Sequence, residues 1–179
     1  MLDRDSATLV VIDFQEKLLP KIHDADAIGS QAIKLIRFAR ELGMPILWTE
    51  QYPKGLGHTV EPIAAELGGE TPIEKTVFGC IAAPGFASAL AASGRKQLLL
   101  TGIEAHICVM QTALAALDEG YEVFIPKDAV GSRTPAEYDA GLERLQRAGA
   151  EIVTTEMAMF ELLREAGTPE FKKTLPLFK

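Results

Sequence analysis

The feature that most constrains this chain is an alternation of short apolar blocks with longer segments of helical period. The blocks are rich in β-branched residues and mostly lack strict polar alternation, which is typical of strands covered on both faces. They are residues 8–12, 45–49, 97–101, 121–125 and 150–154. Helical period is clearest in 33–40, 110–117 and 142–148, and these segments end at Gly43, Gly120 and Gly149, as helix C-termini commonly do.

Strands that alternate with helices form right-handed βαβ crossovers, so we expect an α/β fold with a parallel sheet between two helical layers. A length of 179 residues with 47% hydrophobic side chains suits one core, and residues 1–179 are therefore predicted to be a single domain. Segments 50–76 and 167–179 interrupt the alternation. Ligands in such sheets bind beyond the carboxyl ends of the strands, and candidate residues are expected there.

Charge and cysteine content exclude several classes of protein. With 25 acidic and 18 basic residues the net charge is −7, and no Lys/Arg-rich run offers a nucleic-acid partner its basic patch. The N-terminus has no signal-peptide pattern and no apolar stretch reaches membrane length, so we expect a cytoplasmic protein without a membrane partner. Cys80 and Cys108, with 27 residues between them, suit neither a disulfide framework nor a four-ligand zinc site, and we expect free thiols.

Two charged residues stand near strand ends. Asp13 is the first polar residue after the block 8–12, a position shared by catalytic carboxylates and by carboxylates that cap a turn or helix. Lys75 follows the short apolar pair 72–73 in a loop or short strand, and by itself such a lysine is ordinarily a solvated charge.

Cys108 lies seven residues after Thr101, where the helical period of 110–117 begins. A thiol at a helix N-terminus feels the positive end of the helix dipole, and we expect a lowered pKa and a nucleophilic thiolate. The other interpretation is a small buried apolar side chain. Cys80 follows Phe78-Gly79 in a predicted loop and is interpreted as structural or pocket-lining.

Several other kinds of site have no support in the sequence. The three histidines, His23, His58 and His106, have no spacing typical of metal ligands. No G-x-G-x-x-G follows the first strand, and no G-x-S-x-G occurs. We therefore expect no metal and no cofactor, and the remaining candidate is a cysteine nucleophile whose base is not a neighbouring histidine.

Three motifs resemble the isochorismatase-like cysteine hydrolase superfamily. They are the segments 11–15 (VIDFQ), 74–78 (EKTVF) and 101–113 (TGIEAHICVMQTA), and the segment 48–57 (WTEQYPKGLG) resembles most closely its isochorismatase domain-containing branch. The resemblance covers essentially the whole chain and implies a six-stranded parallel sheet in a Rossmann-like order. In members that bind a metal, an Asp and histidines follow the second strand; residues 50–53 (EQYP) lack them.

The resemblance also implies roles for individual residues. Cys108 would be the nucleophile, Asp13 its base, and Lys75 the cation that positions both. A cis peptide at Ile103–Glu104 would aim the backbone N–H groups of Glu104 and Cys108 at an oxyanion. The pocket would be lined by Phe14, Tyr52, Phe78 and His106.

The chemistry implied is hydrolysis of a small amide or related acyl substrate through a thioester. The family also implies a homo-oligomer, which the apolar residues Leu175, Leu177 and Phe178 of the tail support weakly. The alternative is a protein that keeps this fold for a binding or interaction role and has little turnover.

Overall fold

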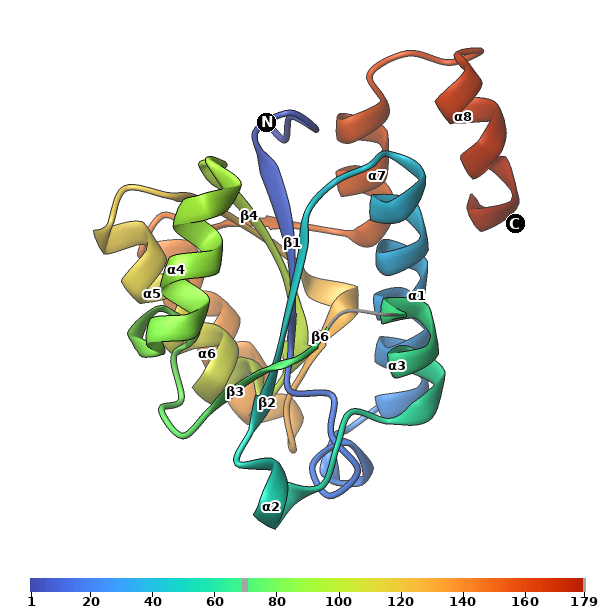
Figure 1. The fold of residues 1–179 in the computed structure, drawn as a ribbon. Helices are drawn as coiled ribbons and strands as arrows, with labels where there is room; N and C mark the ends of the chain where they lie inside the picture. Colours follow the sequence, from blue (N-terminus) through green and yellow to red (C-terminus); the bar gives the residue numbers. More distant parts are fainter. Residues whose placement is uncertain (69–70, 179) are drawn as a thin grey trace.

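Seven parallel strands form one sheet in the computed structural model, which describes residues 1–68 and 71–178 (Figure 1). Six of them follow the order β3-β2-β1-β4-β5-β7, and the two-residue β6 pairs with the end of β4. The strands are β1 (Ala7–Ile12), β2 (Ile46–Gln51), β3 (Ile73–Lys75), β4 (Gln97–Ile103), β5 (Glu122–Pro126), β6 (Val130–Gly131) and β7 (Glu151–Val153). The α/β class and the parallel sheet are confirmed. No apolar block predicted β6 as a separate strand.

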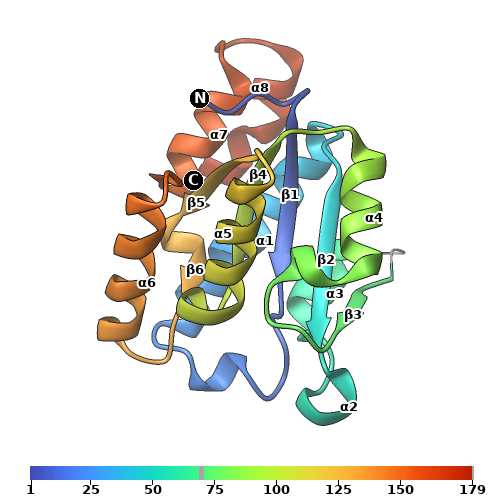
Figure 2. The ribbon, with the colours of Figure 1, turned by 90° about the vertical axis from the view of Figure 1, so that its left-hand side faces the viewer.

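The carboxyl ends of four strands meet at one edge of the sheet. β1 lies between β2 and β4, so the strand order reverses there (Figure 2). Ile12 pairs with Thr49 on β2 and with Gly102 on β4. Gln51 in turn pairs with Lys75 at the end of β3. This edge is the topological switch point, where sheets of this kind bind ligands.

Helices cover both faces of the sheet. They are α1 (Ala25–Glu41), α2 (Pro53–Leu56), α3 (Glu61–Leu67), α4 (Pro84–Ser93), α5 (Met110–Asp118), α6 (Pro135–Arg147), α7 (Thr155–Leu163) and α8 (Pro169–Thr174). α1, α3 and α7 lie on one face, and α4, α5 and α6 on the other (Figure 1). α1, α5 and α6 contain the three segments of predicted helical period. The glycines after them, Gly43, Gly120 and Gly149, have φ of +65°, +82° and +103°, as expected at helix C-termini.

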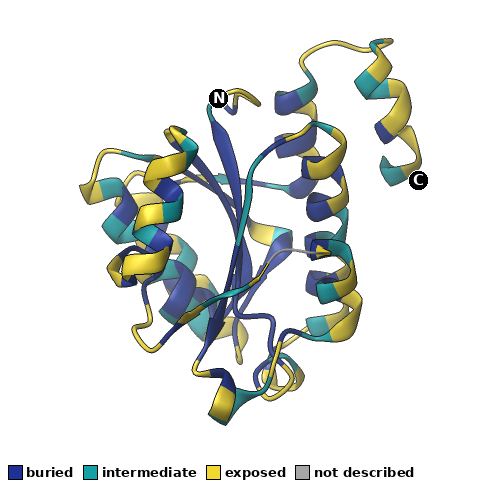
Figure 3. Cartoon of the chain, in the orientation of Figure 1, coloured by how far each residue is buried: buried dark blue, intermediate teal, exposed yellow. Residues whose placement is uncertain are grey.

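The core consists of two apolar layers separated by the sheet. Every residue of β1 is at most 1% exposed, which confirms a strand covered on both faces (Figure 3). Leu9 and Val11 pack in the layer with α1, whereas Val10 and Ile12 pack in the layer with α4 and α5. This alternation assigns a face to each side chain that follows β1.

The two segments that interrupt the alternation hold short elements. Residues 50–76 contain α2, α3 and β3, and the tail forms α8 and a 3-10 turn, Leu175–Phe178. Leu177 and Phe178 pack against the α1-side core, and the Phe178 ring lies 4.7 Å from that of Phe160. These apolar side chains of the tail are therefore satisfied partly within the chain. In the described parts, no helix has the length and apolar character needed to cross a membrane.

Candidate active site

Asp13 leaves the regular alternation of β1. Ile12 faces the α4/α5 layer, so the next side chain of a regular strand would face α1. Asp13 instead has φ +57°, and its carboxylate contacts Thr49 and Lys75, both of which lie on the α4/α5 face. A left-handed backbone at a non-glycine residue costs about 1 to 3 kcal/mol and is concentrated at functional sites. The strained turn places a carboxylate that is 1% exposed on the same face as Cys108.

Both oxygens of the Asp13 carboxylate are held. Oδ1 accepts the Thr49 hydroxyl at 2.7 Å, and Oδ2 lies 2.7 Å from the Lys75 ammonium. The side chains of Asp13 and Lys75 are 0% exposed in this ion pair. Because a buried charge is costly without a partner, each of the two ions depends on the other.

Lys75 is not a solvated charge. It ends β3, and its ammonium donates to Asp13 Oδ2 at 2.7 Å, to Gln51 Oε1 at 2.8 Å and to the Phe78 carbonyl at 3.0 Å. An ammonium has three N–H donors, so these acceptors match it fully. The general expectation for an isolated lysine is wrong here because parallel pairing of β3 with β2 turns the side chain into the protein.

Cys108 lies where the sequence predicted, at the beginning of a helix. A π-helical turn, Ala105–Val109, leads directly into α5, and Cys108 in that turn is 3% exposed. Its thiol pKa is raised, not lowered: burial penalises the thiolate most, and the Asp13 charge adds to this, while Lys75 acts in the opposite direction. The prediction of a thiolate made by the helix dipole is therefore wrong, since desolvation dominates. Cys108 is therefore a neutral thiol beside the Asp13 carboxylate.

The loop between β4 and Cys108 turns at Glu104. The described residues contain no cis peptide bond, so the cis bond expected at Ile103–Glu104 is wrong. A left-handed Glu104, with φ +56° and ψ +54°, reverses the chain instead. Its carboxylate is held by Arg133 Nε at 2.6 Å. Its carbonyl accepts the Ile107 N–H at 2.8 Å, whereas its own N–H donates to no group among the described residues.

The four residues expected to line a pocket lie in different surroundings. Tyr52 and Phe78 flank Lys75, and each is 53% exposed. Phe14 is 1% exposed within the α1-side core. The His106 ring contacts Ser132 Oγ at 2.9 Å and packs near α6. Of the four, Tyr52 and Phe78 contact Lys75 through their backbones, whereas the Phe14 side chain packs on the α1 side of the sheet.

Sequence reasoning missed the polar residues of β2. Thr49 and Gln51 are two positions apart, so both point to the face that carries Asp13 and Lys75. The available signal was weak: two polar side chains with a spacing of two at the end of an apolar block. Cys80, interpreted from sequence as structural or pocket-lining, is fully buried with its sulfur 3.9 Å from Thr49 Oγ1, and burial raises its pKa to about 11.

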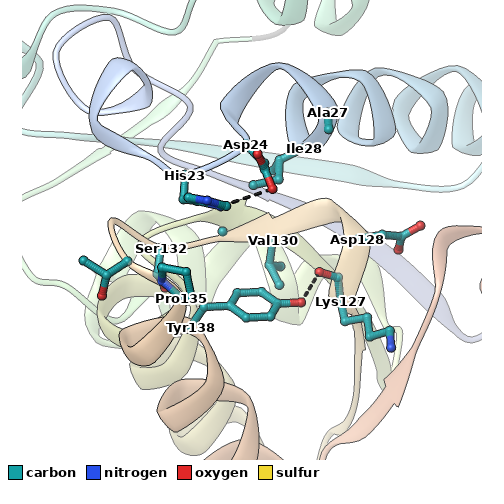
Figure 4. A pocket seen from close by; sticks show the side chains of 12 residues that line it. His23, Asp24, Ala27, Ile28, Lys127, Asp128, Val130, Ser132, Pro135 and Tyr138 are labelled. Carbon is teal, nitrogen blue, oxygen red and sulfur yellow. Dashed lines mark hydrogen bonds and ion pairs between the residues drawn. The ribbon is translucent and has the colours of Figure 1, made fainter.

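A cavity of about 320 Å³ opens next to this edge, between the N-termini of α1 and α6 (Figure 4). Its walls include Ile28, Val130 and Tyr138, and it contains none of Asp13, Lys75 and Cys108. Ser132 lines it and also contacts His106. Asp13, Lys75 and Cys108 are themselves buried, at 1%, 4% and 3% exposed.

A second buried carboxylate lies at the same edge. Glu50 Oε1 accepts the backbone N–H of Thr59 at 2.6 Å and its hydroxyl at 2.9 Å, and Oε2 lies 3.0 Å from His58 Nδ1. Its acceptors are therefore occupied by the chain itself. Within residues 1–68 and 71–178 no group of three His, Cys, Asp or Glu side chains is placed to hold a metal ion.

Known proteins resemble this chain over nearly its whole length. The model of the isochorismatase domain matches residues 7–157. Isochorismatase domain-containing protein 2A of Mus musculus is 38% identical over 178 residues, which are 98% of this chain and 84% of the mouse protein.

Two solved structures extend the comparison. MAR1 ribonuclease of Caenorhabditis elegans has a TM-score of 0.92 and 36% identity, covering 98% of this chain and 91% of that one. The YcaC gene product of Escherichia coli, described as an octameric hydrolase of unknown specificity, has a TM-score of 0.87 and 27% identity, covering 92% and 82%. The family model matches most of the chain, and the sheet has the strand order described above. The chain therefore belongs to the isochorismatase family and has the hydrolase fold of that family.

Proposed function

We propose that this protein is a cysteine hydrolase that cleaves a small amide or related acyl compound through a thioester on Cys108. The observation that carries the proposal is the burial of an Asp13–Lys75 ion pair against a neutral thiol at the switch point. A buried ion pair is rarely favoured for stability alone. A nucleophile beside its base, with a third group that orients the base, is the arrangement required for covalent catalysis.

The first half of the reaction forms the thioester. The Cys108 sulfur attacks the carbonyl carbon while its proton passes to Asp13, which suits a thiol whose pKa is raised. The negative charge that develops on the carbonyl oxygen is stabilised by the backbone N–H groups of Glu104 and Cys108. Removing one such donor costs about 3 kcal/mol in other enzymes. The carbon–nitrogen bond then breaks, and Asp13 returns the proton to the leaving amine.

The second half releases the acid. Asp13 takes a proton from water, the oxygen attacks the thioester carbonyl, and the carbon–sulfur bond breaks. The sulfur leaves as a thiol after it regains the proton from Asp13, so the enzyme returns to its starting state. Lys75 has no N–H left for a substrate, because all three have acceptors in the chain. Its role is therefore to hold and orient Asp13, not to bind the substrate.

The test uses p-nitrophenyl acetate as an acyl probe, followed by a panel of small primary amides, carbamoyl compounds and isochorismate. Wild type should release p-nitrophenol and carry an acetyl group on the Cys108 peptide, detected by mass spectrometry. Cys108→Ala should lose about a thousandfold in rate. Ser93→Ala, at the far end of α4, is the control. Equal hydrolysis of every compound by wild type and Cys108→Ala would overturn the proposal and favour a binding role without turnover.

The name of the C. elegans relative raises ribonuclease activity as a second candidate. The net charge of −7 opposes it, because RNA-binding surfaces neutralise phosphates with basic side chains. A fluorogenic RNA oligonucleotide distinguishes the two activities. We expect no cleavage above that of a Cys108→Ala preparation purified in parallel.

We also propose a homo-oligomer, supported by the octameric E. coli relative. Tyr52, Val77 and Phe78 form an exposed apolar group beside the site, and Leu175 is 40% exposed in the tail. Exposed apolar groups of this kind are common at subunit contacts. Light scattering of the full chain at micromolar concentration should give a multiple of the 19.4 kDa chain mass, and a monomer would exclude the proposal.

A further inference from the structure

The Gln51 side chain directly contacts the Asp13–Lys75 ion pair. Its Oε1 accepts a hydrogen bond from the Lys75 ammonium at 2.8 Å, and its Nε2 donates to the Thr76 carbonyl at 2.9 Å. An ammonium offers only donors and a carbonyl only acceptors, so this network fixes which end of the amide carries the oxygen. Gln51 therefore presents an oxygen to Lys75 from a fixed direction.

The backbone of Gln51 is fixed independently by a buried glutamine. Gln15 is 0% exposed, and its Oε1 accepts the Gln51 N–H at 2.7 Å. Gln15 Nε2 donates to the Gln51 carbonyl at 2.9 Å and to the Gly57 carbonyl at 2.7 Å. The side chain that contacts Lys75 thus belongs to a residue held on both sides of its peptide unit.

The neutrality of this amide has an electrostatic consequence. Lys75 has one anionic acceptor, Asp13, and its other acceptors are neutral: Gln51 Oε1, the Phe78 carbonyl and, at 3.4 Å, the Val77 carbonyl. The neighbouring acid, Glu50, lies on the opposite face of β2, where Thr59 and His58 occupy its oxygens. The chain therefore keeps its acid at position 50 away from the ammonium and places the uncharged residue next to it. The Asp13–Lys75 pair has no net charge, and no second carboxylate among the described residues contacts the ammonium.

We propose that Gln51 is a positioning residue for the hydrolysis: its neutral oxygen aims the Lys75 ammonium at Asp13 and keeps Asp13 the only anion that the ammonium contacts. This rests on the proposed cysteine hydrolase function. The charged and titratable groups that act on the Cys108 thiol are Asp13 from the end of β1, Lys75 from β3 and Cys80 from the turn before α4. Gln51 acts on the thiol through Lys75 and touches no substrate.

Two substitutions test separately the hydrogen bond that Gln51 accepts from Lys75 and the absence of charge on the Gln51 side chain. Gln51→Met keeps the length of the side chain and removes the acceptor. Gln51→Glu keeps the shape and adds a second carboxylate to the same ammonium. Gln97→Met is the matched control, because Gln97 is also a buried, hydrogen-bonded glutamine, 5% exposed, but lies at the opposite, amino-terminal end of the sheet.

The measurements are kcat and KM for p-nitrophenyl acetate, and the rate of Cys108 alkylation by iodoacetamide as a function of pH. We expect Gln51→Met to lower kcat about tenfold with little change in KM, since one hydrogen bond to a charged group is lost. Gln51→Glu should move the alkylation profile to higher pH by about one unit, because a second anion next to Lys75 disfavours the thiolate. Gln97→Met should lower the melting temperature to a similar degree as Gln51→Met and leave both profiles unchanged.

The outcomes distinguish this inference from the proposed function. If both Gln51 variants keep the wild-type kcat and pH profile while Cys108→Ala is inactive, Gln51 has no positioning role and the hydrolase proposal stands. If Cys108→Ala retains full activity, the proposed function itself fails. Should Gln51→Met not fold, the isosteric Gln51→Glu decides the question through the pH profile alone.

Discussion

Two buried carboxylates at neighbouring strand ends have different surroundings. Asp13 after β1 is 1% exposed and Glu50 in β2 is 2% exposed, and both accept hydrogen bonds on both oxygens. Glu50 has ordinary strand geometry and binds the loop that contains Thr59 and the exposed His58. Asp13 has a strained left-handed backbone, a buried cation and a thiol beside it.

The two carboxylates are almost equally buried, so burial alone does not distinguish them, whereas their partners and backbone geometry do. The acceptors of Glu50 are filled by donors that fasten a loop, so its charge contributes to local structure. Asp13 is placed, at the cost of backbone strain, next to a buried thiol. Strain, a buried counter-ion and an adjacent thiol distinguish Asp13 from Glu50, and substitutions at the two carboxylates test whether only Asp13 takes part in the chemistry that we propose.

The largest expected effect comes from removing the charge of each carboxylate. Asp13→Asn keeps the shape of the side chain but cannot take the thiol proton, so acyl-probe turnover should fall by about two to four orders of magnitude. Glu50→Gln should leave turnover within a few-fold and destabilise the fold by about 1 to 3 kcal/mol, because its donors are less well satisfied. Steady-state kinetics and urea unfolding of the two variants make the comparison. Equal turnover losses would contradict the distinction.

The second effect concerns the counter-ion. Lys75→Met leaves Asp13 as a buried charge without its cation, and we expect a loss of about 3 to 5 kcal/mol in the free energy of unfolding. Arg147→Met is the control: Arg147 pairs with Glu143 on the surface of α6, and such pairs contribute about 0 to 1 kcal/mol. Urea unfolding measures both variants. A loss in Lys75→Met as small as that of the control would show that the buried pair is not needed for the fold.

The sequence predicts much of this molecule because the fold depends on patterns that are local. Apolar blocks and helical periods identify the parallel sheet, and the glycines at 43, 120 and 149 end their helices as expected. Position made Asp13 and Cys108 candidates, because one follows a strand and the other lies at a helix start, but their roles were implied only by the resemblance. β3 is only three residues long, so Lys75 was identified through the resemblance and not through its spacing.

The rest of the site depends on contacts between distant residues. The partners of Lys75 come from β1, β2 and the turn after β3, and no local pattern brings them together. The raised thiol pKa of Cys108 depends on how completely later elements bury it, which a helix-start pattern does not contain. The left-handed backbone of Glu104, found in place of the expected cis bond, likewise depends on the surrounding structure and not on a local sequence pattern.

A third, smaller effect follows from the buried thiols near Asp13. Burial raises the pKa of Cys108, and of Cys80 to about 11, so the folded chain keeps both thiols protonated where the unfolded chain begins to lose its protons. Their contribution to stability is complete below the ordinary thiol pKa of about 8.5 and declines as the pH rises toward the raised values. The melting temperature of wild type should therefore fall more steeply above that pH than that of Cys108→Ala. Parallel curves would show that the thiol is not buried as described.

The smallest effect belongs to the structural carboxylate. The Glu50 carboxylate, through its hydrogen bond and its charge, raises the pKa of the exposed His58 imidazole. A folded-state pKa above the unfolded value means that the stabilisation is complete below about pH 6.5, the unperturbed histidine value, and is lost as the pH rises through the raised value. The difference in melting temperature between wild type and His58→Gln should thus shrink as the pH rises above about 6.5. The same scan in a Glu50→Gln background should show a weaker pH dependence, because the carboxylate that raises the pKa most is gone and only the charges of Glu16 and Glu74 still raise it. Acyl-probe turnover at saturating substrate should not follow the His58 titration, because the Glu50 side chain and His58 lie on the opposite side of β2 from the side chains of Thr49 and Gln51. A turnover profile that did follow it would show that Glu50 also takes part in the reaction. The distinction between Asp13 and Glu50 would then be wrong.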